Sequence, residues 1–354
     1  MTPGSFTDIE INSQPEVWRA TLHGVQEQWD NLAPQAREIA ARPLIVIGCG
    51  STYYLSLAAA AVLRQAGVQA WAFPSSELVY FPLELLPKGF NLLAISRSGT
   101  TSETLWAIDR YRREFPHGKV AVITCVPETP MVQQANLLLL APDAQEQSVA
   151  QTRSFTSMAL MAQALAAVST GDAARLQRQG NLADSLEKLF PEFAGDFEAL
   201  GADSSLDRYF FLGSGPLYGI ANEAMLKTKE MSSSWAEAYH FLEFRHGPMS
   251  VANEHALVVG LVSDSAPEAE LRVLREMKQL GAHTLAMLED DSRLDVQGID
   301  QVVVLNSGLS EWERGALYLP LIHRLAFAHA LAKGMNPDRP ENLSAVIRLD
   351  SSAL

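Results

Sequence analysis

The sequence lacks the features that mark several classes of protein. Only two cysteines, Cys49 and Cys125, occur among 354 residues, too few for a disulfide framework, and both end apolar runs where a thiol acts as a small buried hydrophobe. No uncharged apolar run reaches the ~18 residues that a membrane-spanning helix requires. The first residues show no basic stretch followed by an apolar one, the pattern of a signal peptide. We therefore expect a soluble, cytoplasmic protein without a membrane partner.

Positive charge is also scarce. Lys and Arg number 27 against 41 Asp and Glu, which gives a formal net charge of -14 at pH 7. Such a chain repels a polyanion, and no basic run or basic stripe with interleaved aromatic residues overrides the repulsion. The composition therefore argues against nucleic acid as a partner. A small anionic ligand stays compatible with it, because a local site can oppose the field of the whole protein.

What the chain does contain is an alternation of short apolar runs and helical patterns. The runs predict β-strands at 43–48, 70–73, 90–96, 119–125 and 136–142, and a second series at 208–213, 256–262, 283–288 and 301–306. Most runs are followed by a turn signal and an amphipathic segment, which predicts an α/β architecture with parallel sheets covered on both faces. The nearly strand-free segment 151–200 predicts helices that join two halves of similar length, and a last helix is expected at about 310–333.

The two halves echo each other at their first strand. The segments "IVIGCGSTYY" (45–54) and "FFLGSGPLYG" (210–219) share a strand, a G-x-G pair and the start of a helix. A duplicated fold explains this similarity economically, and chance recurrence of G-x-G is the alternative. The pattern does not fit a dinucleotide site, because Tyr53 replaces the third glycine and no acidic residue ends the next strand.

Hydroxyl residues follow two of the predicted strands. Ser51 and Thr52 open a helix after the first strand, and the stretch 96–104 holds six hydroxyl residues in nine positions with Gly99 for a turn. The carboxyl ends of parallel strands meet at the crevice where open α/β sheets bind ligands, and helix N-termini offer unpaired N–H donors there. These loops predict a site for a phosphate monoester. For any single Ser or Thr, ordinary N-capping or turn formation is the alternative.

Together, "IGCGSTYY" and "ISRSGTTSET" resemble the phosphate-binding loops of the sugar isomerase (SIS) domain family, and the two-unit arrangement resembles the isomerase half of glucosamine-6-phosphate synthase. The resemblance implies two tandem SIS domains, each a flavodoxin-like parallel sheet flanked by helices. It divides the chain into an N-terminal helical segment (1–32), a first SIS domain (33–170), a helical linker (171–200) and a second SIS domain with a C-terminal tail (201–354).

The resemblance also implies which residues contact a sugar phosphate. They are Ser51, Thr52, Ser96, Arg97, Ser98 and Thr101. Arg97 departs from the pattern, since the synthase has glutamine there, and it adds a positive charge. Val149, in "SVAQTRSFTSM", takes the place of a valine that helps to line the sugar site.

The densest chemistry lies in 222–248. If 216–231 is a helix, Glu223, Lys227 and Glu230 fall on one face at spacings i, i+4 and i+7. On this pattern alone, a surface ion pair between Glu223 and Lys227 is an alternative. Downstream, "AEAYHFLEFRHGP" resembles the family signature AEAY…ELKHGP, with Arg245 in place of lysine.

This second resemblance implies catalytic roles. Glu230 would move a proton between C1 and C2 of an open-chain sugar phosphate, and His246 would open the sugar ring, tasks that need a carboxylate base and an acid–base group of near-neutral pKa. Lys227 would stabilise charge on the enediolate or keep Glu230 ionised, and Glu237 would position the loop. In the family the histidine comes from the partner subunit, which implies a homodimer with shared active sites.

No metal and no cofactor are expected. His240, Glu243 and His246 form H-x-x-E-x-x-H, but at helical spacing they spread over a wide arc, and "HGP" is typical of a loop. Cys49 has no evident base partner that would make it a nucleophile.

The extent of the resemblance shapes the expected function. It covers only the isomerase half of the synthase, Thr2 stands where a catalytic cysteine would be, and Ala345 replaces a tail lysine, so glutamine-driven synthesis is not expected. The first hypothesis is an enzyme that opens an amino sugar 6-phosphate, isomerises it through Glu230 and releases ammonia. The alternatives are plain aldose/ketose phosphate isomerisation, deglycation of a fructosamine phosphate, and a non-catalytic phosphosugar sensor.

Overall fold

The computed structural model describes residues 2–349, which form two compact units. The amino unit comprises residues 16–146, 153–180 and 344–349, and the carboxyl unit comprises residues 2–15, 147–152 and 181–343. Both units are discontinuous in the sequence, whereas the boundaries expected from the sequence are continuous. The segments expected at 1–32 and 171–200 each contribute residues to both units.

The amino unit contains a five-stranded parallel sheet with the order β2-β1-β3-β4-β5. Its strands are β1 (Leu44–Gly48), β2 (Ala70–Pro74), β3 (Asn91–Ile95), β4 (Val120–Thr124) and β5 (Leu137–Leu140). The five strands predicted in the first half are confirmed, and their ends differ by one or two residues. Strands β1, β3 and β4 are buried along their whole length, as expected for apolar strands with helices on both faces.

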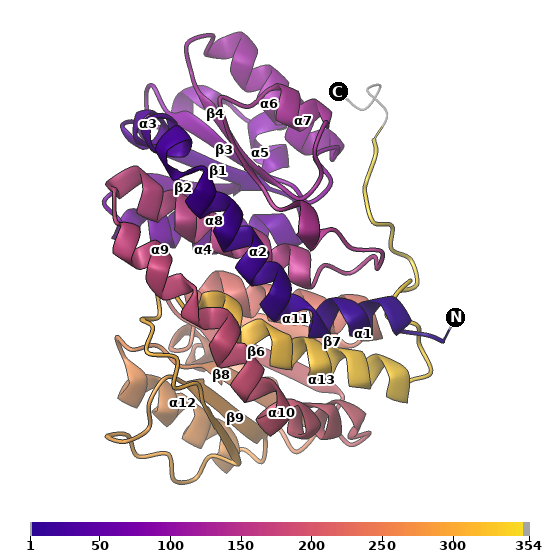
Figure 1. Cartoon of the computed structure of the whole chain (residues 1–354). Coiled ribbons are helices and arrows are strands. Elements are labelled where there is room, and N and C mark those ends of the chain that lie inside the picture. Colours follow the sequence, from indigo (N-terminus) through magenta and orange to yellow (C-terminus); the bar gives the residue numbers. More distant parts are fainter. Residues whose placement is uncertain (1, 350–354) are drawn as a thin grey trace. The chain divides into compact units, whose positions relative to one another are not determined.

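Helices cover the two faces of this sheet (Figure 1). The helices of this unit are α2 (Gln14–Glu27), α3 (Trp29–Ala40), α4 (Ser51–Gln65), α5 (Ser75–Tyr80), α6 (Ser102–Glu114), α7 (Pro130–Gln133), α8 (Arg153–Thr170) and α9 (Ala173–Gln179), with short 3-10 turns η1 (Leu83–Leu85) and η2 (Pro142–Ala144). Helix α8 packs against α3 and α4. Helix α6 contributes Ile108 and Tyr111 to a buried cluster with residues of β1, β3 and β4.

The carboxyl unit repeats the same sheet. Its parallel strands are β6 (Arg208–Gly213), β7 (Trp235–Tyr239), β8 (Ala256–Leu261), β9 (His283–Leu288) and β10 (Gln301–Val304). The order β10-β9-β8-β6-β7, read from the β7 edge, is the amino sheet's order of second, first, third, fourth and fifth strand. The glycine pairs match as well, since Gly50 and Gly215 both have a φ of 55°. The predicted duplication is therefore confirmed.

Strand β7 is not among the strands predicted from the sequence, which include none in 235–239. The segment WAEAY alternates, but its burial pattern is weak because Trp235 is exposed and only Ala236 is fully buried. Trp235 pairs with Arg208 of β6, which lies 27 positions earlier in the chain. The local sequence therefore does not reveal the pairing.

The carboxyl unit is completed by helices that frame the sheet. They are α1 (Ser5–Asn12), α10 (Asn181–Ala202), α11 (Leu217–Ser232), α12 (Pro267–Gln279) and α13 (Leu319–Ala332), with 3-10 turns η3 (Glu243–Arg245), η4 (Pro248–Val251) and η5 (Gly315–Tyr318). Helix α11 confirms the helix predicted at 216–231. The last helix starts later than predicted, because η5 precedes it and Pro320 lies in its first turn; it ends as predicted, before Gly334 with φ 71°.

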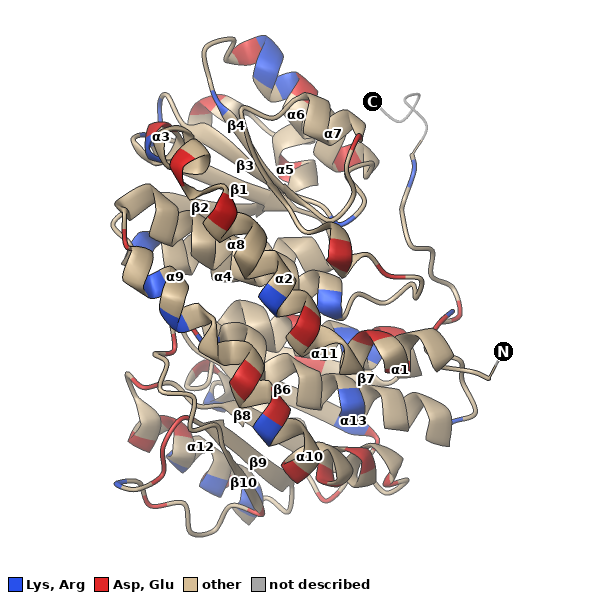
Figure 2. Ribbon diagram, viewed as in Figure 1, with Lys and Arg blue, Asp and Glu red and all other residues tan. Residues whose placement is uncertain are grey.

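Acidic residues outnumber basic ones along the ribbon, in line with the negative net charge (Figure 2). Within residues 2–349, the structure has no helix that is both long enough and apolar enough to span a membrane.

Candidate functional site

Two loops of the amino unit meet at the carboxyl ends of the neighbouring strands β1 and β3. The first leads through Gly50 into α4, and the second, 96–101, leads into α6. Gly99 has a φ of 64°, and a Cβ at this position would lie 2.2 Å from Thr129 Oγ1. Only glycine fits there, so the turn that shapes the second loop depends on it.

The hydroxyl groups of these loops organise the loops themselves. Thr52 Oγ1 donates to the Cys49 carbonyl and accepts from the Cys49 N–H, both at 2.9 Å. Ser96 Oγ accepts from the Gly99 N–H at 3.2 Å and lies 3.3 Å from Thr101 Oγ1. Thr101 is the N-cap of α6 but forms no side-chain cap, so ordinary capping does not account for its hydroxyl. The arrangement presents Ser and Thr hydroxyls beside helix N–H groups, a combination suited to a phosphate.

Arg97 brings a positive charge to the second loop although its side chain is almost buried, with 9% of the residue exposed. Its Nη1 lies 3.6 Å from the carboxylate of Glu146, and its Nη2 donates to the Ala345 carbonyl at 3.0 Å. The Leu349 N–H donates to Ser102 Oγ at 2.9 Å. Arg97 and Ser102 therefore hold the segment 344–349 against the loop 96–101 and the start of α6. No motif or local spacing in the sequence points to Glu146, which is 49 positions from Arg97.

Cys49 lies in the first loop but is no candidate nucleophile. Burial raises the pKa of its thiol, although Ser75 and Thr104 form hydrogen bonds with it that act in the opposite direction. The thiol therefore stays protonated at neutral pH. Cys125 is fully buried, and burial raises its pKa as well.

In the carboxyl unit, the loop after β8, which corresponds to the loop after β3, is closed by carboxylates of the same unit. Glu270 accepts from the Ser263 N–H at 2.6 Å, and burial raises its pKa. Glu311 accepts from the Asp264 N–H at 2.6 Å and from the Ser265 N–H at 3.2 Å. These carboxylates take the backbone donors that an anionic ligand would use. The duplication therefore leaves the loops of the amino unit as the better candidates for a phosphate site.

Helix α11 carries the charged residues predicted for proton transfer. Lys227 Nζ lies 3.4 Å from Glu223 Oε1 and donates to Glu230 Oε2. The side chains of Lys227 and Glu223 are fully buried, whereas that of Glu230 is 21% exposed. The shared helix face is confirmed, and the alternative of a surface ion pair is wrong. A buried ammonium is thus paired with a carboxylate that is partly open to solvent.

His323 of α13 is a further buried group near this cluster. Both of its ring nitrogens are buried without a hydrogen-bond partner among the described residues. Burial lowers the pKa of His323 to about 3, and the charge of Lys227 adds to the effect. His323 is therefore a neutral core residue.

The segment after α11 holds the other candidates. Tyr239 donates a hydrogen bond to Glu237 Oε2, and burial, with this carboxylate, raises the pKa of Tyr239 to about 12. His240 stacks on Tyr218 with ring centroids 3.8 Å apart. His246 ends η3 and is exposed to solvent. Among residues 2–349 no group of three or more His, Cys, Asp or Glu side chains has the geometry to hold a metal.

Val149 lies in the loop 147–152 of the carboxyl unit, where its N–H donates to the Asp338 carbonyl at 3.0 Å. The predicted site residues thus fall into two sets. The residues predicted to bind phosphate, Ser51, Thr52, Ser96, Arg97, Ser98 and Thr101, lie in the amino unit, and the residues of α11, β7, η3 and the Val149 loop belong to the carboxyl unit.

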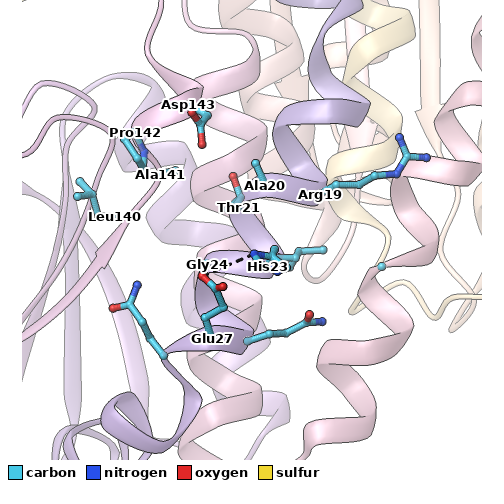
Figure 3. A pocket seen from close by; sticks show the side chains of 14 residues that line it. Arg19, Ala20, Thr21, His23, Gly24, Glu27, Leu140, Ala141, Pro142 and Asp143 are labelled. Carbon is cyan, nitrogen blue, oxygen red and sulfur yellow. Dashed lines mark ion pairs between the residues drawn. The ribbon is translucent and has the colours of Figure 1, made fainter.

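A separate cavity of about 730 Å³ opens in the amino unit between α2, residues 140–143 and Gly180 (Figure 3). His23 Nδ1 lies 3.7 Å from Glu27 Oε2 on its wall, and both side chains are largely exposed. None of the predicted site residues lines this cavity.

Comparisons with known proteins bear on both units. The family model of the SIS domain matches residues 39–168 and 204–298. A glutamine–fructose-6-phosphate aminotransferase (isomerizing) of Pyrobaculum aerophilum is 28% identical over 354 residues, which cover 96% of this chain and 57% of that protein. The chain thus spans little more than half the length of this curated relative.

Two solved structures share the fold over almost the whole chain. Tagatose-6-phosphate ketose/aldose isomerase from Escherichia coli aligns with a TM-score of 0.86 and 24% identity, over 97% of this chain and 98% of that one. Glucosamine-6-phosphate deaminase from Thermotoga maritima aligns with a TM-score of 0.76 and 25% identity, over 98% of this chain and all of that one (100%).

Proposed function

Because the chain belongs to the SIS domain family, we propose that it is an enzyme that isomerises and deaminates an amino sugar 6-phosphate. The observation that carries the proposal is the pairing of Glu230, a partly exposed carboxylate, with the fully buried ammonium of Lys227. A carboxylate held in this way is suited to take a proton from the carbon next to a carbonyl group and to return it to the neighbouring carbon.

In the proposed reaction, an amino sugar phosphate and water give a ketose phosphate and ammonia. The open-chain substrate carries its carbonyl at C1 and its amino group at C2. Glu230 takes the proton from C2, and the electron pair of that C–H bond forms a C1=C2 double bond while the π pair of the C1 carbonyl moves to O1, which takes up a proton. The lone pair of the amino nitrogen then forms the C2=N bond, the C1=C2 pair takes the proton back at C1, and the nitrogen releases one proton. The resulting imine at C2 adds water and expels ammonia, which leaves the C2 ketone. Lys227 supplies positive charge beside Glu230 while the negative charge develops.

The phosphate of the substrate is assigned to the loops of the amino unit. The proposed contacts are Ser51, Thr52, Ser96, Arg97, Ser98 and Thr101. Thr52 acts mainly by shaping its loop, because its hydroxyl is bonded to the backbone of Cys49. Arg97 adds the charge that favours a dianion. Val149 is assigned to the sugar, and Glu237 is assigned to positioning the loop at the sugar site.

Ring opening is assigned to His246, whose side chain is exposed to solvent. We propose that the active form is a homodimer in which the partner subunit's His246 serves each site. A mixing experiment tests this. Glu230→Gln and His246→Asn are each expected to be inactive, and reassociated mixtures of the two are expected to regain part of the activity. Mixtures that form heterodimers and stay inactive would refute shared sites.

The assay for the main proposal is ammonia release from glucosamine 6-phosphate, coupled to glutamate dehydrogenase, within a panel of hexose and hexosamine 6-phosphates. Equal amounts of ammonia and ketose phosphate support isomerising deamination. Ketose formed from an aldose phosphate without ammonia would point to plain isomerisation, and release of an amino acid from a fructosamine phosphate would point to deglycation. Tight binding of a sugar phosphate without turnover would point to a sensor.

Two variants anchor this assay. Glu230→Gln removes the base and is expected to abolish product formation. Lys229→Gln is the matched control, because Lys229 is an exposed neighbour on the same helix, and it is expected to keep wild-type turnover.

A further inference from the structure

A buried carboxylate on α1 holds the loop that contains Val149. Glu10 is only 2% exposed. Its Oε1 accepts hydrogen bonds from the backbone N–H groups of Gln147 at 2.6 Å and Ser148 at 3.3 Å, and its Oε2 accepts from the Ser148 hydroxyl. A carboxylate is tolerated in the interior when several donors satisfy it. All three of these donors come from the two residues directly before Val149.

The helix that carries Glu10 is itself fixed to the carboxyl unit. Arg324 of α13 donates to Asp8 Oδ1 at 2.5 Å and to Asn12 Oδ1 at 2.6 Å. At the other end of α1, the Asp338 carboxylate accepts from both the N–H and the hydroxyl of Thr7 at 2.8 Å. Glu10 therefore acts from a rigid support and not from a loose terminal helix.

The loop is held from its other side as well. The Val149 N–H donates to the Asp338 carbonyl at 3.0 Å, so the residue that anchors α1 also anchors the loop. Ala150 packs in one buried cluster with Met231 of α11 and two alanines of α13. Met231 directly follows Glu230, so the loop lies against the turn of α11 that carries the proposed base.

Val149 is partly accessible between two buried residues of this loop. Ser148 is 2% exposed and Ala150 is 1% exposed, whereas Val149 between them is partly exposed. Glu10 holds Ser148 on one side of Val149, and packing holds Ala150 on the other side. A shift of residues 147–148 therefore moves Val149 relative to Ala150.

We propose that Glu10 is a positioning residue of the active site, which sets the place of Val149 beside Glu230 through its hydrogen bonds to Gln147 and Ser148. The inference rests on the proposed function, in which Val149 lines the sugar site. Glu10 touches no substrate itself. Its effect is on how well the loop is placed for the sugar.

The test is Glu10→Gln, which keeps the size of the side chain but removes the charge. The KM for the sugar phosphate is expected to rise about tenfold, the difference between a charged and a neutral hydrogen bond, while kcat falls less. The affinity for inorganic phosphate is expected to stay unchanged, because the loops proposed to bind phosphate, which contain Ser51 and residues 96–101, belong to the amino unit and Glu10 does not. Amide hydrogen–deuterium exchange of peptides covering 147–150 is expected to speed up, whereas exchange in α11 is not.

The matched control is Asp8→Asn, which weakens the link between α1 and Arg324 without touching the loop. It is expected to keep the wild-type KM. If Glu10→Gln does not fold, Ser148→Ala removes one of the three donors and is expected to change KM and exchange in the same direction, by less.

Two results would overturn the inference. One is loop exchange and KM in Glu10→Gln that match the wild type. The other is an equal rise of KM in Asp8→Asn at the same loss of melting temperature, which would mean that any loosening of α1 has this effect. The exchange measurement needs no turnover. A wild-type protein that turns over no sugar phosphate therefore refutes the proposed function, whereas unaltered exchange in Glu10→Gln refutes this inference.

Discussion

The buried lysine of α11 offers a sharp test of the charge cluster. Lys227→Met keeps the length of the side chain but removes the positive charge 3.4 Å from the buried Glu223 carboxylate. Removing one partner of a buried ion pair costs roughly 3–5 kcal/mol, because the remaining charge stays in the interior. For a unit of this size, that loss lowers the melting temperature by about 6–20 °C. Urea unfolding and calorimetry measure the two quantities.

A double variant separates the structural role of Lys227 from its proposed catalytic role. In Glu223→Gln/Lys227→Met both members of the buried pair are neutral, so most of the lost stability is expected to return. Turnover is not expected to return, because Glu230 still lacks the ammonium beside it. Lys229→Met, at an exposed position, is the control and is expected to change stability by less than about 0.5 kcal/mol.

Two outcomes would refute this reasoning. A loss below about 1 kcal/mol in Lys227→Met, the size typical of exposed pairs, would mean that the pair is not buried as described. Recovery of turnover in the double variant would mean that Lys227 serves stability alone.

Three further predictions concern acid stability, the tail and binding stoichiometry. Burial lowers the pKa of His323 from 6.5 to about 3, so protonation of this residue favours the unfolded chain. As the pH is lowered from 6.5 towards 3, the free energy of unfolding is therefore expected to decrease by up to about 1.4 kcal/mol per pH unit. His323→Leu is expected to flatten this slope in urea unfolding measured between pH 6.5 and 3; an unchanged slope would refute the assignment. Arg97→Gln is expected to speed proteolysis within 344–349 and to raise KM about tenfold, and equal cleavage would contradict the observed contact. Calorimetric titration with a sugar phosphate is expected to show one site per chain, because Glu270 and Glu311 occupy the backbone donors of the loop after β8; two sites would contradict this.

The fold was largely predictable from the sequence because its strands are continuous apolar runs. Strands such as β1 and β3 are buried on both faces, so they read as apolar stretches between turn signals. The G-x-G pairs marked the duplication for the same local reason. Strand β7 was not predicted, because it is a partly exposed edge strand and the local sequence does not encode its pairing with β6.

The candidate site was predictable only where helical spacing determines neighbours. The positions i, i+4 and i+7 placed Glu223, Lys227 and Glu230 on one face, but not their burial, which depends on packing between α11 and α13. The hydrogen bond from Ser148 to Glu10 joins residues 138 positions apart, and no local sequence pattern predicts it. Contacts of this kind follow from the tertiary fold and are not visible in composition or spacing.

The central claim is that Glu230 moves a proton between C2 and C1 of a sugar phosphate. The most direct measurement uses glucosamine 6-phosphate that carries deuterium at C2 and follows the label by NMR. In the wild type and in Lys229→Gln, the label is expected to leave C2 and to appear at C1 of the product or in solvent. In Glu230→Gln, which is expected still to bind the sugar phosphate, the label is predicted to stay at C2. Loss of the label from C2 at the wild-type rate in Glu230→Gln would contradict the account.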